Sequence, residues 1–519
     1  MEGVLISKIR YTTVIGLEIH AELLTKTKLF CGCPNAFGSG ENENVCPGCL
    51  ALPGTLPALN REAVDLAIKA GLALGCGITQ LTRWDRKSYF YADLPGGYQI
   101  TQMFAPICTG GGLSIGDRFV RLDHIHLEED AGKLVHDTKR NVTRIDLNRA
   151  GVPLIEIVTK PDMRSAEEAA RFIEKIRLEL IYAGVCDGRM EQGRLRFDAN
   201  VSVMPEGSEV LGTRVEIKNL NSVRFVTMAI EQEARRQIGI LEEGGKLRQE
   251  TRRFVEGGGG TAPMREKENA IDYRYFPDAN IPPLGIDAGY IDALKASMPE
   301  PPESRRSRYT GEHMMTAGDA DTLLAKREIA DFYDGMIALY ADSRGALGMV
   351  RGEILRRLGE RPADAATTDA VAVNAVAANA AATNAAATNA AATDSTEPRS
   401  GADGLGISPA DAVRLLRMNA AGEIGANNMK KAVGLLMRGG GKSLDDIIDE
   451  NDMLIKEDPE ALSAIVREAL LANPGAVASY KAGETKVLGF FMGWCNRKLK
   501  GAVQPKTLQN ELLKQLGNI

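Results

Sequence analysis

Apolar and polar residues alternate with the period of a β-strand in three stretches of the first half of the chain. Residues 14–20 place three aliphatic side chains on one face and the pair Glu18 and His20 on the other. Residues 193–203 and 213–218 repeat this division, and their polar positions are Arg194, Arg196, Asp198, Asn200, Ser202, Arg214, Glu216 and Lys218. We therefore predict a sheet with one apolar core face and one face lined by acids and bases.

Helical spacing of apolar residues predicts two helices among these strands. One covers residues 60–75, with Asn60 as its N-cap and Gly75 at its end. The other covers residues 165–183 and starts with the capping-box pair Ser165 and Glu168. Strands outnumber helices up to about residue 290, so the pattern predicts the α+β class.

A proline-rich segment at residues 281–302 predicts a domain boundary, and helical periods dominate beyond it. We predict a sheet domain over residues 1–295, a helical domain over 296–407 and a helical tail over 408–519. Residues 361–403 repeat the pattern Asn-Ala-Ala-Ala-Thr and contain no large apolar side chain. We interpret them as a flexible insertion without function.

The composition is that of a soluble globular protein, with 44% hydrophobic and 25% charged residues among 519. The first residues lack the apolar core of a signal peptide, and no apolar run is long enough to span a membrane. We expect a cytoplasmic protein that binds no membrane. The formal net charge of −6 excludes a global attraction to nucleic acid, so any such contact requires a local basic patch.

Four of the eight cysteines are bunched together as Cys31, Cys33, Cys46 and Cys49. Paired short turns that offer four thiolates favour a tetrahedral zinc site. An iron–sulfur cluster uses the same ligands and is the alternative. Because four thiolates leave no coordination position for water, we predict a structural rather than a catalytic metal.

The polar sheet face has two interpretations. It is either the solvated outer face of an antiparallel sheet or a magnesium–nucleotide site, in which carboxylates hold the cation and basic groups neutralise phosphates. Residues 128–130, the acidic run Glu-Glu-Asp, favour the second interpretation. The run Gly439-Gly440-Gly441-Lys442-Ser443 resembles the end of a phosphate-binding P-loop but lacks its first glycine and a preceding strand, so we interpret it as a helix break.

Six motifs together closely resemble the B-subunit family of aspartyl/glutamyl-tRNA amidotransferases. They are V-I-G-L-E-I-H at 14–20, D-R-K-S-Y-F-Y at 85–91, G-Y-Q-I-T-Q at 97–102, H-L-E-E-D-A-G-K at 126–133, D-L-N-R-A-G-V-P-L-I-E-I-V at 146–158 and D-Y-R-Y-F-P at 272–277. The resemblance runs over nearly the whole chain. It implies an antiparallel-sheet cradle that carries the active site and the zinc, a helical domain, and a small helical tail that touches tRNA.

The resemblance also implies an activity. The family uses ATP and magnesium to phosphorylate the side chain of Glu or Asp on mischarged Glu-tRNA(Gln) or Asp-tRNA(Asn), and ammonia then displaces the phosphate. The ammonia comes from glutamine hydrolysed in an amidase subunit, and a small third subunit holds the two together as a heterotrimer. Positions matching the family's metal and phosphate site are Glu18, His20, Glu129, Glu156, Asp198 and Glu216; those matching the mouth of its ammonia channel are Lys87 and Glu129.

From these residues we predict a magnesium site lined by His20, Glu18, Glu129, Asp198 and Glu216, with Arg196 or Lys218 reaching the phosphate oxygens. Three positions depart from the family's usual residues: Ala92, Gly96 and Arg194. Two other functions compete with this hypothesis. One is a zinc-stapled RNA-binding scaffold without chemistry of its own, and the other is the E-type paralogue of the glutamyl-specific enzyme.

The tail carries a local basic surplus in an acidic protein. Residues 481–514 contain Lys481, Lys486, Arg497, Lys498, Lys500, Lys506 and Lys514 against Glu484 and Glu511. We predict that this segment grips tRNA. The alternative is the solvated face of a helix.

The cysteine spacing leads to a test. We expect one zinc per chain, and we expect the double substitution Cys31→Ser and Cys46→Ser to abolish its binding in elemental analysis. Loss of the metal costs mainly stability, because structural zinc contributes on the order of 10 kcal/mol to small zinc-held units. Full zinc occupancy in the double variant would contradict the assignment of these cysteines as zinc ligands.

Overall fold

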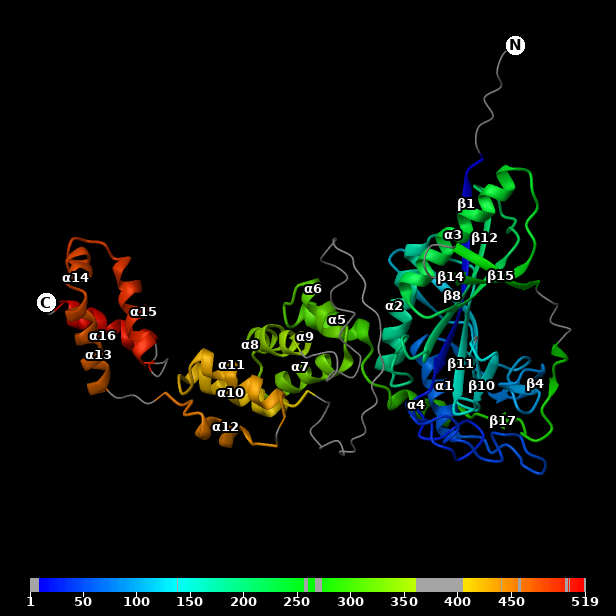
Figure 1. The fold of residues 1–519 in the computed structure, drawn as a ribbon, viewed down its shortest axis with the longest axis horizontal. Helices are drawn as coiled ribbons and strands as arrows, with labels where there is room; N and C mark the ends of the chain where they lie inside the picture. Colours follow the sequence, from blue (N-terminus) through cyan, green and yellow to red (C-terminus); the bar gives the residue numbers. More distant parts are fainter. Residues whose placement is uncertain are drawn as a thin grey trace, which may run out of the picture. The chain divides into compact units, whose positions relative to one another are not determined.

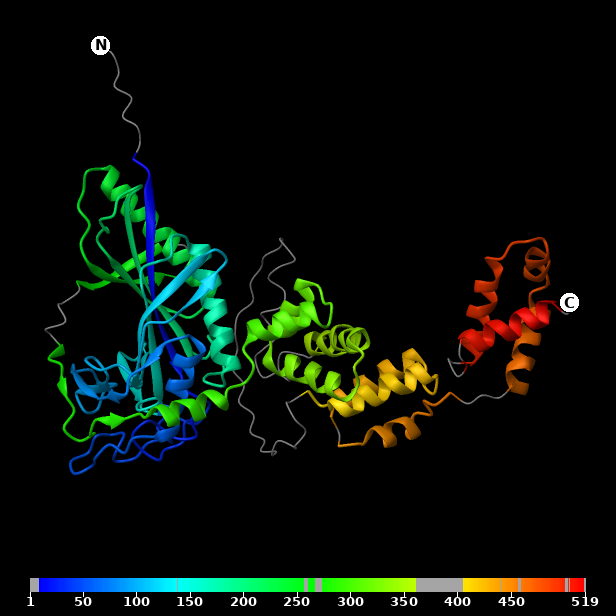
Figure 2. The same ribbon diagram turned by 180° about the vertical axis from the view of Figure 1, so that it is seen from behind.

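The computed structural model describes residues 9–137, 139–255, 260–266, 273–360, 405–439, 441–455, 459–499, 503 and 505–517. The chain divides into two compact units, Met1–Arg305 and Arg306–Ile519. Figures 1 and 2 show the sheet in the first unit and helices alone in the second. Within the described residues, no helix combines the length and apolar character needed to cross a membrane.

The first unit is organised around one ten-stranded sheet, with the order β15-β14-β13-β12-β1-β11-β8-β6-β2 and with β7 paired to β8. Neighbouring strands in this sheet run antiparallel except β13 with β14. The strands are β1 (Tyr11–Glu22), β2 (Gly77–Ile78), β6 (Cys108–Thr109), β7 (Gly112–Ile115), β8 (Arg118–Glu129), β11 (Pro153–Thr159), β12 (Leu195–Pro205), β13 (Val215–Leu220), β14 (Glu250–Val255) and β15 (Gly260–Glu266).

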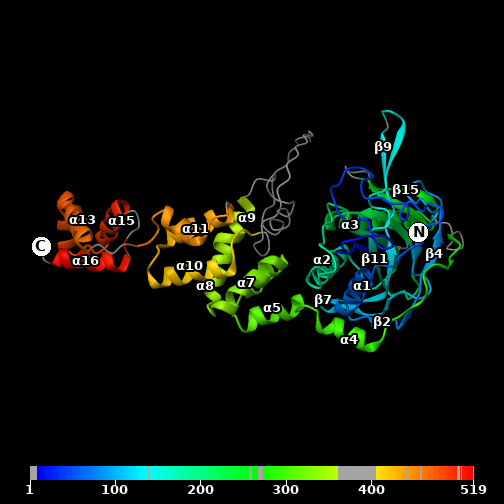
Figure 3. The ribbon, with the colours of Figure 1, turned by 90° about the horizontal axis from the view of Figure 1, so that it is seen from below.

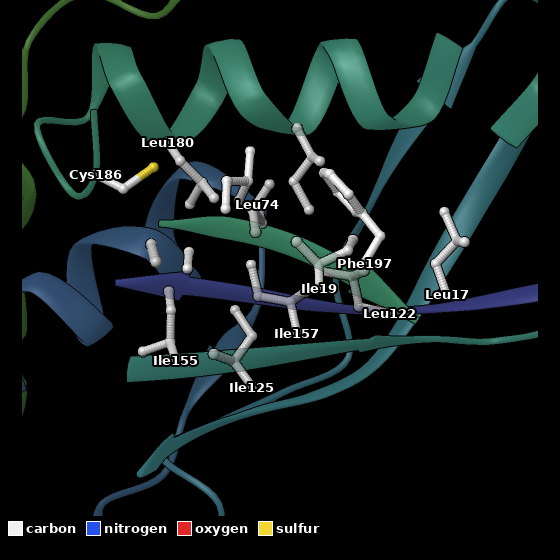
Figure 4. Close-up of a cluster of buried hydrophobic side chains, with 14 of the residues drawn as sticks. Leu17, Ile19, Leu74, Leu122, Ile125, Ile155, Ile157, Leu180, Cys186 and Phe197 are labelled. Atoms are coloured by element: carbon white, nitrogen blue, oxygen red, sulfur yellow. The ribbon is translucent and has the colours of Figure 1, made fainter. Parts of the chain in front are cut away.

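One face of this sheet is the hydrophobic core. The alternating residues of β12 from Leu195 to Val203 are almost completely buried, as the pattern predicts. Three helices supply the rest of the core: α1 (Arg61–Ala73), α2 (Ala166–Tyr182) and α3 (Val223–Glu242). Figure 4 shows α2 lying over the strands, with Leu180 directed toward the aliphatic side chains of the sheet. Burial of this single continuous face is the main stabilising term of the unit.

Local signals set the helix ends close to their predicted positions. The side chain of Asn60 accepts hydrogen bonds from the first turn of α1, and that of Ser165 accepts one from the Glu168 amide. The predicted capping box is only half formed, because the Glu168 carboxylate accepts instead from the Arg164 amide. Gly184 follows α2 with φ of 72°, a left-handed conformation that glycine adopts without strain.

Smaller elements surround the polar face. Strands β4 (Asp85–Ser88), β5 (Tyr98–Thr101) and β16 (Phe276–Pro277) form a three-stranded sheet, and β3 (Leu81–Thr82) pairs with β17 (Leu284–Gly285). The hairpin of β9 (Lys133–Asp137) and β10 (Val142–Asp146) projects from the unit (Figure 3). Helix α4 (Ala288–Ala296) packs against α1, and the chain then enters α5 (Pro302–Gly311), within which the first unit ends.

The second unit contains α6 (Ala317–Leu324), α7 (Arg327–Leu339), α8 (Ser343–Met349), the π-helical segment η2 (Val350–Leu355), α9 (Arg356–Glu360), α10 (Pro409–Ala421), α11 (Ala426–Met437) and α12 (Leu444–Glu450). Its last part contains α13 (Pro459–Ala472), α14 (Pro474–Lys481), α15 (Val487–Leu499) and α16 (Pro505–Gly517), which share a core of their own. Helix α11 ends before Gly439, and α12 begins after Ser443. The glycine-rich run that resembles the end of a P-loop therefore lies between two helices.

The predicted α+β class with helices in the later half is confirmed. The division between the two units falls after Arg305, a little beyond the predicted boundary at residue 295. The separation of the helical domain from the tail at residues 407 and 408 stays a prediction. The predicted insertion at 361–403 lies outside the described residues.

The buried face of α2 allows a stability test. Phe172 is fully buried on this helix, whereas Arg171 beside it is exposed. We expect Phe172→Ala to lower the free energy of unfolding by about 3–5 kcal/mol, and Arg171→Ala to change it by less than about 0.5 kcal/mol. Urea unfolding followed by tryptophan fluorescence measures both, because Trp84 is buried in the same core. Equal effects of the two substitutions would contradict this account of the core.

Candidate functional site

Backbone register brings the polar side chains of four strands into rows. On β1, His20 lies opposite Glu156 of β11 and Arg196 of β12, and Glu156 in turn lies opposite His126 of β8. In the next row, Glu18 lies opposite Asp198. Directly paired residues of antiparallel strands have adjacent side chains. The pairing therefore gathers acids and bases that are far apart in the sequence.

Three residues of the first row and Glu128 form a group of ionisable side chains. We call this group the histidine cluster and define it as His20, His126, Glu128 and Glu156. The Glu156 carboxylate lies 3.3 Å from His20 Nε2 and 3.6 Å from His126 Nε2. His126 Nε2 also lies 3.3 Å from a carboxylate oxygen of Glu128. Thr101 of β5 donates to that same Glu128 oxygen at 3.2 Å, so the small sheet helps to position it.

Proton affinities in the histidine cluster follow from burial and from these contacts. Burial alone lowers the pKa of His20, but the hydrogen bond and charge of Glu156 outweigh it and raise the pKa to about 9. Burial alone raises the pKa of Glu156, but the charges of His126 and His20 hold it well below its usual range. In the absence of a cation, the cluster therefore holds an ionised Glu156 beside a protonated His20, and the charges of Glu156 and Glu128 outweigh burial and raise the pKa of His126 as well.

The second group, which we call the acidic cluster, consists of Glu18, Asp198 and Glu216. Lys218 Nζ lies 2.9 Å from an Asp198 oxygen and 3.2 Å from a Glu216 oxygen. Asn200 donates from Nδ2 to Glu18 Oε1 at 2.9 Å. Burial, followed by the charges of neighbouring carboxylates, raises the pKa of Glu18. The acidic cluster thus contains more carboxylates than its lysine neutralises.

Both clusters fit a divalent cation. One ligand atom from each of Glu18, Asp198 and Glu216 lies within 4.8 Å of the others, and the same holds for His20, Glu128 and Glu156. Octahedral magnesium with oxygen ligands at about 2.1 Å spaces those ligands about 3–4 Å apart. Burial and then the charges of neighbouring carboxylates raise the pKa of Glu18, and a bound cation would relieve the repulsion between those carboxylates.

Arg196, predicted to reach phosphate, has its own carboxylate partner. Its Nη2 lies 2.8 Å from Asp130 Oδ2, and Arg149 Nε lies 3.4 Å from the same oxygen. Asp130 therefore pairs with two guanidinium groups, and the charges of Glu22 and Asp198 also act on Arg196. Lys218, the other predicted phosphate contact, lies within the acidic cluster.

Glu129 lies apart from both clusters. Its carboxylate accepts from the Ile100 amide at 3.0 Å and lines a cavity of about 260 Å³ together with Cys31 and Cys49. Burial raises the pKa of Glu129 to about 7. Lys87 belongs to β4. Burial alone lowers the pKa of Lys87, but the charges of Glu128 and other neighbours outweigh burial and raise it.

The four clustered cysteines come together as their spacing predicts. One sulfur from each of Cys31, Cys33, Cys46 and Cys49 lies within 4.8 Å of the others. Tetrahedral zinc with Zn–S bonds of about 2.3 Å requires sulfurs about 3.8 Å apart, so these residues fit the metal. Lys28 Nζ lies 3.7 Å from Cys49 Sγ and so complements thiolate charge.

The sequence pattern marked Glu128 only as part of the acidic run 128–130, and the resemblance assigned the metal-site role to Glu129, whereas the structure places Glu128 with His20 and Glu156. The alternation of Ile125 and Leu127 with His124 and His126 already places Glu128 on the polar face. A register shift in β8 before His124 interrupts the longer pattern and hid this signal. His126 and Asn200 lie within a quoted motif and among the polar positions of residues 193–203, but they were not predicted as site residues. His126 belongs to the histidine cluster, and Asn200 donates to Glu18 of the acidic cluster.

The polar face is not the solvated outer surface of the first interpretation. Asp198 and Glu216 are only 6% and 5% exposed, and His20 and Glu156 are mostly enclosed. Charged residues are rarely buried without a paired partner or a metal. The enclosed face therefore has the composition of a binding site for a cation and an anionic ligand.

Comparison with known proteins places the chain in a family. The model of the GatB/GatE catalytic domain matches residues 13–292, and that of the GatB domain matches residues 331–516.

Three similar curated proteins carry the name of the B subunit of aspartyl/glutamyl-tRNA(Asn/Gln) amidotransferase. The protein from Ruminiclostridium cellulolyticum is 42% identical in an alignment of 521 positions that covers 98% of this chain and 98% of its own. That from Myxococcus xanthus is 42% identical and covers 97% of this chain and 98% of its own. That from Geobacter sulfurreducens is 42% identical and covers 98% and 99%. With both domain models and this near full-length identity, the chain belongs to the B-subunit family of aspartyl/glutamyl-tRNA(Asn/Gln) amidotransferases.

Proposed function

We propose that the chain uses ATP to phosphorylate the side-chain carboxylate of Glu or Asp on mischarged tRNA, and that it converts the product to the amide with ammonia. The products are Gln-tRNA(Gln), Asn-tRNA(Asn) or both. The enclosed acid–base face carries this proposal. A scaffold that only binds RNA gains nothing from buried carboxylates, which repel phosphate unless a cation lies between them.

The reacting carboxylate needs no general base, because it is already ionised at pH 7. The task of the protein is instead to bring this carboxylate and the triphosphate together and to offset their negative charges. Magnesium, held by the acidic cluster and by His20 with Glu128 and Glu156, would supply the main neutralising charge. Lys218 and Arg196 contribute fixed positive charge at the two ends of the face.

Ammonia must arrive from elsewhere, since we recognise no glutaminase nucleophile among the cysteines. We propose that a separate amidase subunit supplies it from glutamine, and that a small third subunit completes the heterotrimer. Lys87 and Glu129 remain our proposal for the residues at the mouth of the ammonia channel. In support, Lys87 on β4 feels the charge of Glu128 in the histidine cluster, and Glu129, the next residue of β8, lines the cavity on the cysteine side of that strand.

The acidic cluster gives the sharpest test of the kinase step. We expect Asp198→Ala to abolish amidation of mischarged tRNA by the assembled heterotrimer, even with ammonium chloride supplied, while mischarged-tRNA binding persists. Asp162→Ala is the matched control, because this carboxylate pairs with Arg121 away from the face. Amidation restored by ammonium would move Asp198 to ammonia delivery and reject the kinase role of this strand.

The helical tail allows a second test. Helices α13, α15 and α16 share a core of their own. Ending the chain before Pro459 therefore removes this last part of the tail, with its basic residues, as one unit. We expect this truncation to weaken tRNA binding and to reduce the slope of log affinity against log salt by roughly 1 for each lost phosphate contact. Glutamine hydrolysis by the heterotrimer is the control. Unchanged tRNA affinity would refute the assignment of the tail.

A further inference from the structure

Five aromatic rings form a continuous row beside the histidine cluster. The centroids of successive rings lie 6.1, 6.2, 6.1 and 6.5 Å apart, and each pair meets edge to face. In order of contact the rings are Tyr91, Tyr89, Tyr273, Tyr275 and Phe104. They come from the segment after β4, the segment before β16 and the loop after β5. Lys87 Nζ lies 5.2 Å from the Tyr273 centroid, near the middle of the row.

The two ends of this row differ in their surroundings. At one end, Phe104 is 55% exposed, and the guanidinium of Arg83 lies 5.4 Å from its ring centroid. Its neighbour Tyr275 has a pKa raised by burial, with opposing influences from Lys87 and the carboxylates of the histidine cluster. At the other end, Tyr91 is also exposed, but among the described residues no arginine or lysine lies over its ring, whereas Arg83, which pairs with Asp85 at 3.7 Å, lies over the ring of Phe104.

We infer that the Phe104 end of the row binds the unpaired 3′-terminal adenosine of the aminoacyl-tRNA, with the base stacked on Phe104 and a backbone phosphate near Arg83. This inference rests on the proposed function. In that reaction the amino acid is esterified to the terminal ribose, so the terminal base must lie within one nucleotide of the reacting carboxylate. The Phe104 end combines an open ring, a cation and proximity to the histidine cluster.

Physical chemistry favours an RNA end over a protein surface here. Unpaired bases stack on aromatic side chains, and arginine both stacks on rings and pairs with phosphate. A further cation lies against a ring of the same small sheet, since Arg86, which pairs with Asp278, lies 4.2 Å from the Tyr98 centroid. Phe104 also contacts Tyr275, which feels the charges of Glu128 and Glu156, so a base stacked on Phe104 lies near the histidine cluster.

The test uses the full chain assembled with its amidase and small subunits, and a mischarged tRNA that carries 2-aminopurine in place of its terminal adenine. Stacking quenches the fluorescence of this base. We expect quenching by the wild-type complex, its loss in Phe104→Ala and its retention in Phe104→Trp. We expect kcat/KM for amidation to fall roughly five- to a hundredfold in Phe104→Ala, the range for loss of one stacked base.

Tyr91→Ala is the matched control, because Tyr91 is 57% exposed at the opposite end of the same row. Quenching that survives Phe104→Ala, or that is lost in Tyr91→Ala, would overturn the inference. Dissociation of the Phe104→Ala complex in gel filtration would also overturn it, because the ring would then hold the complex together. A wild-type complex that amidates without quenching rejects the stacking site alone, whereas failure of that complex to amidate rejects the proposed function.

Discussion

The rest of the first unit depends on the antiparallel register of β1 with β11 and β12. This register sets His20 between Glu156 and Arg196, and Glu18 beside Asp198. Because strand side chains alternate, a slip of one residue would turn every core side chain to the polar face and every acid to the core. The hydrophobic effect that fixes the core therefore also fixes the geometry of the candidate site.

Such a face is costly to bury, and the structure limits this cost by pairing. Glu156 is held between two imidazoles, and Lys218 joins two carboxylates of the acidic cluster. What remains is an excess of negative charge around Glu18, whose pKa is raised. An excess of this kind binds a proton more tightly than an isolated carboxylate does, and it also attracts a hard divalent cation, which competes with the proton. The repulsion between these carboxylates, which destabilises the fold without a cation, thus favours the binding of a cation.

Neighbouring residues of one strand serve two different places. Glu128 contacts His126 and Thr101 on the polar face, whereas Glu129 accepts from the Ile100 amide and lines the cavity beside the cysteines. This division follows from the alternation of side chains at the end of β8. It links the cysteine loop to the polar face through the end of one strand, so a metal held by these cysteines would fix one wall of the site.

The sequence by itself determined the α+β class, both faces of β12, the cysteine cluster and the start of α2, because period, spacing and capping are local signals. Family resemblance, read from the motifs, added the expected activity. Only the tertiary structure decided which acids share a site. A register shift in β8 disguised the position of Glu128, and the separation of the two clusters depends on pairing between strands more than a hundred residues apart. Such pairing is set by packing of the whole sheet, which no local pattern contains.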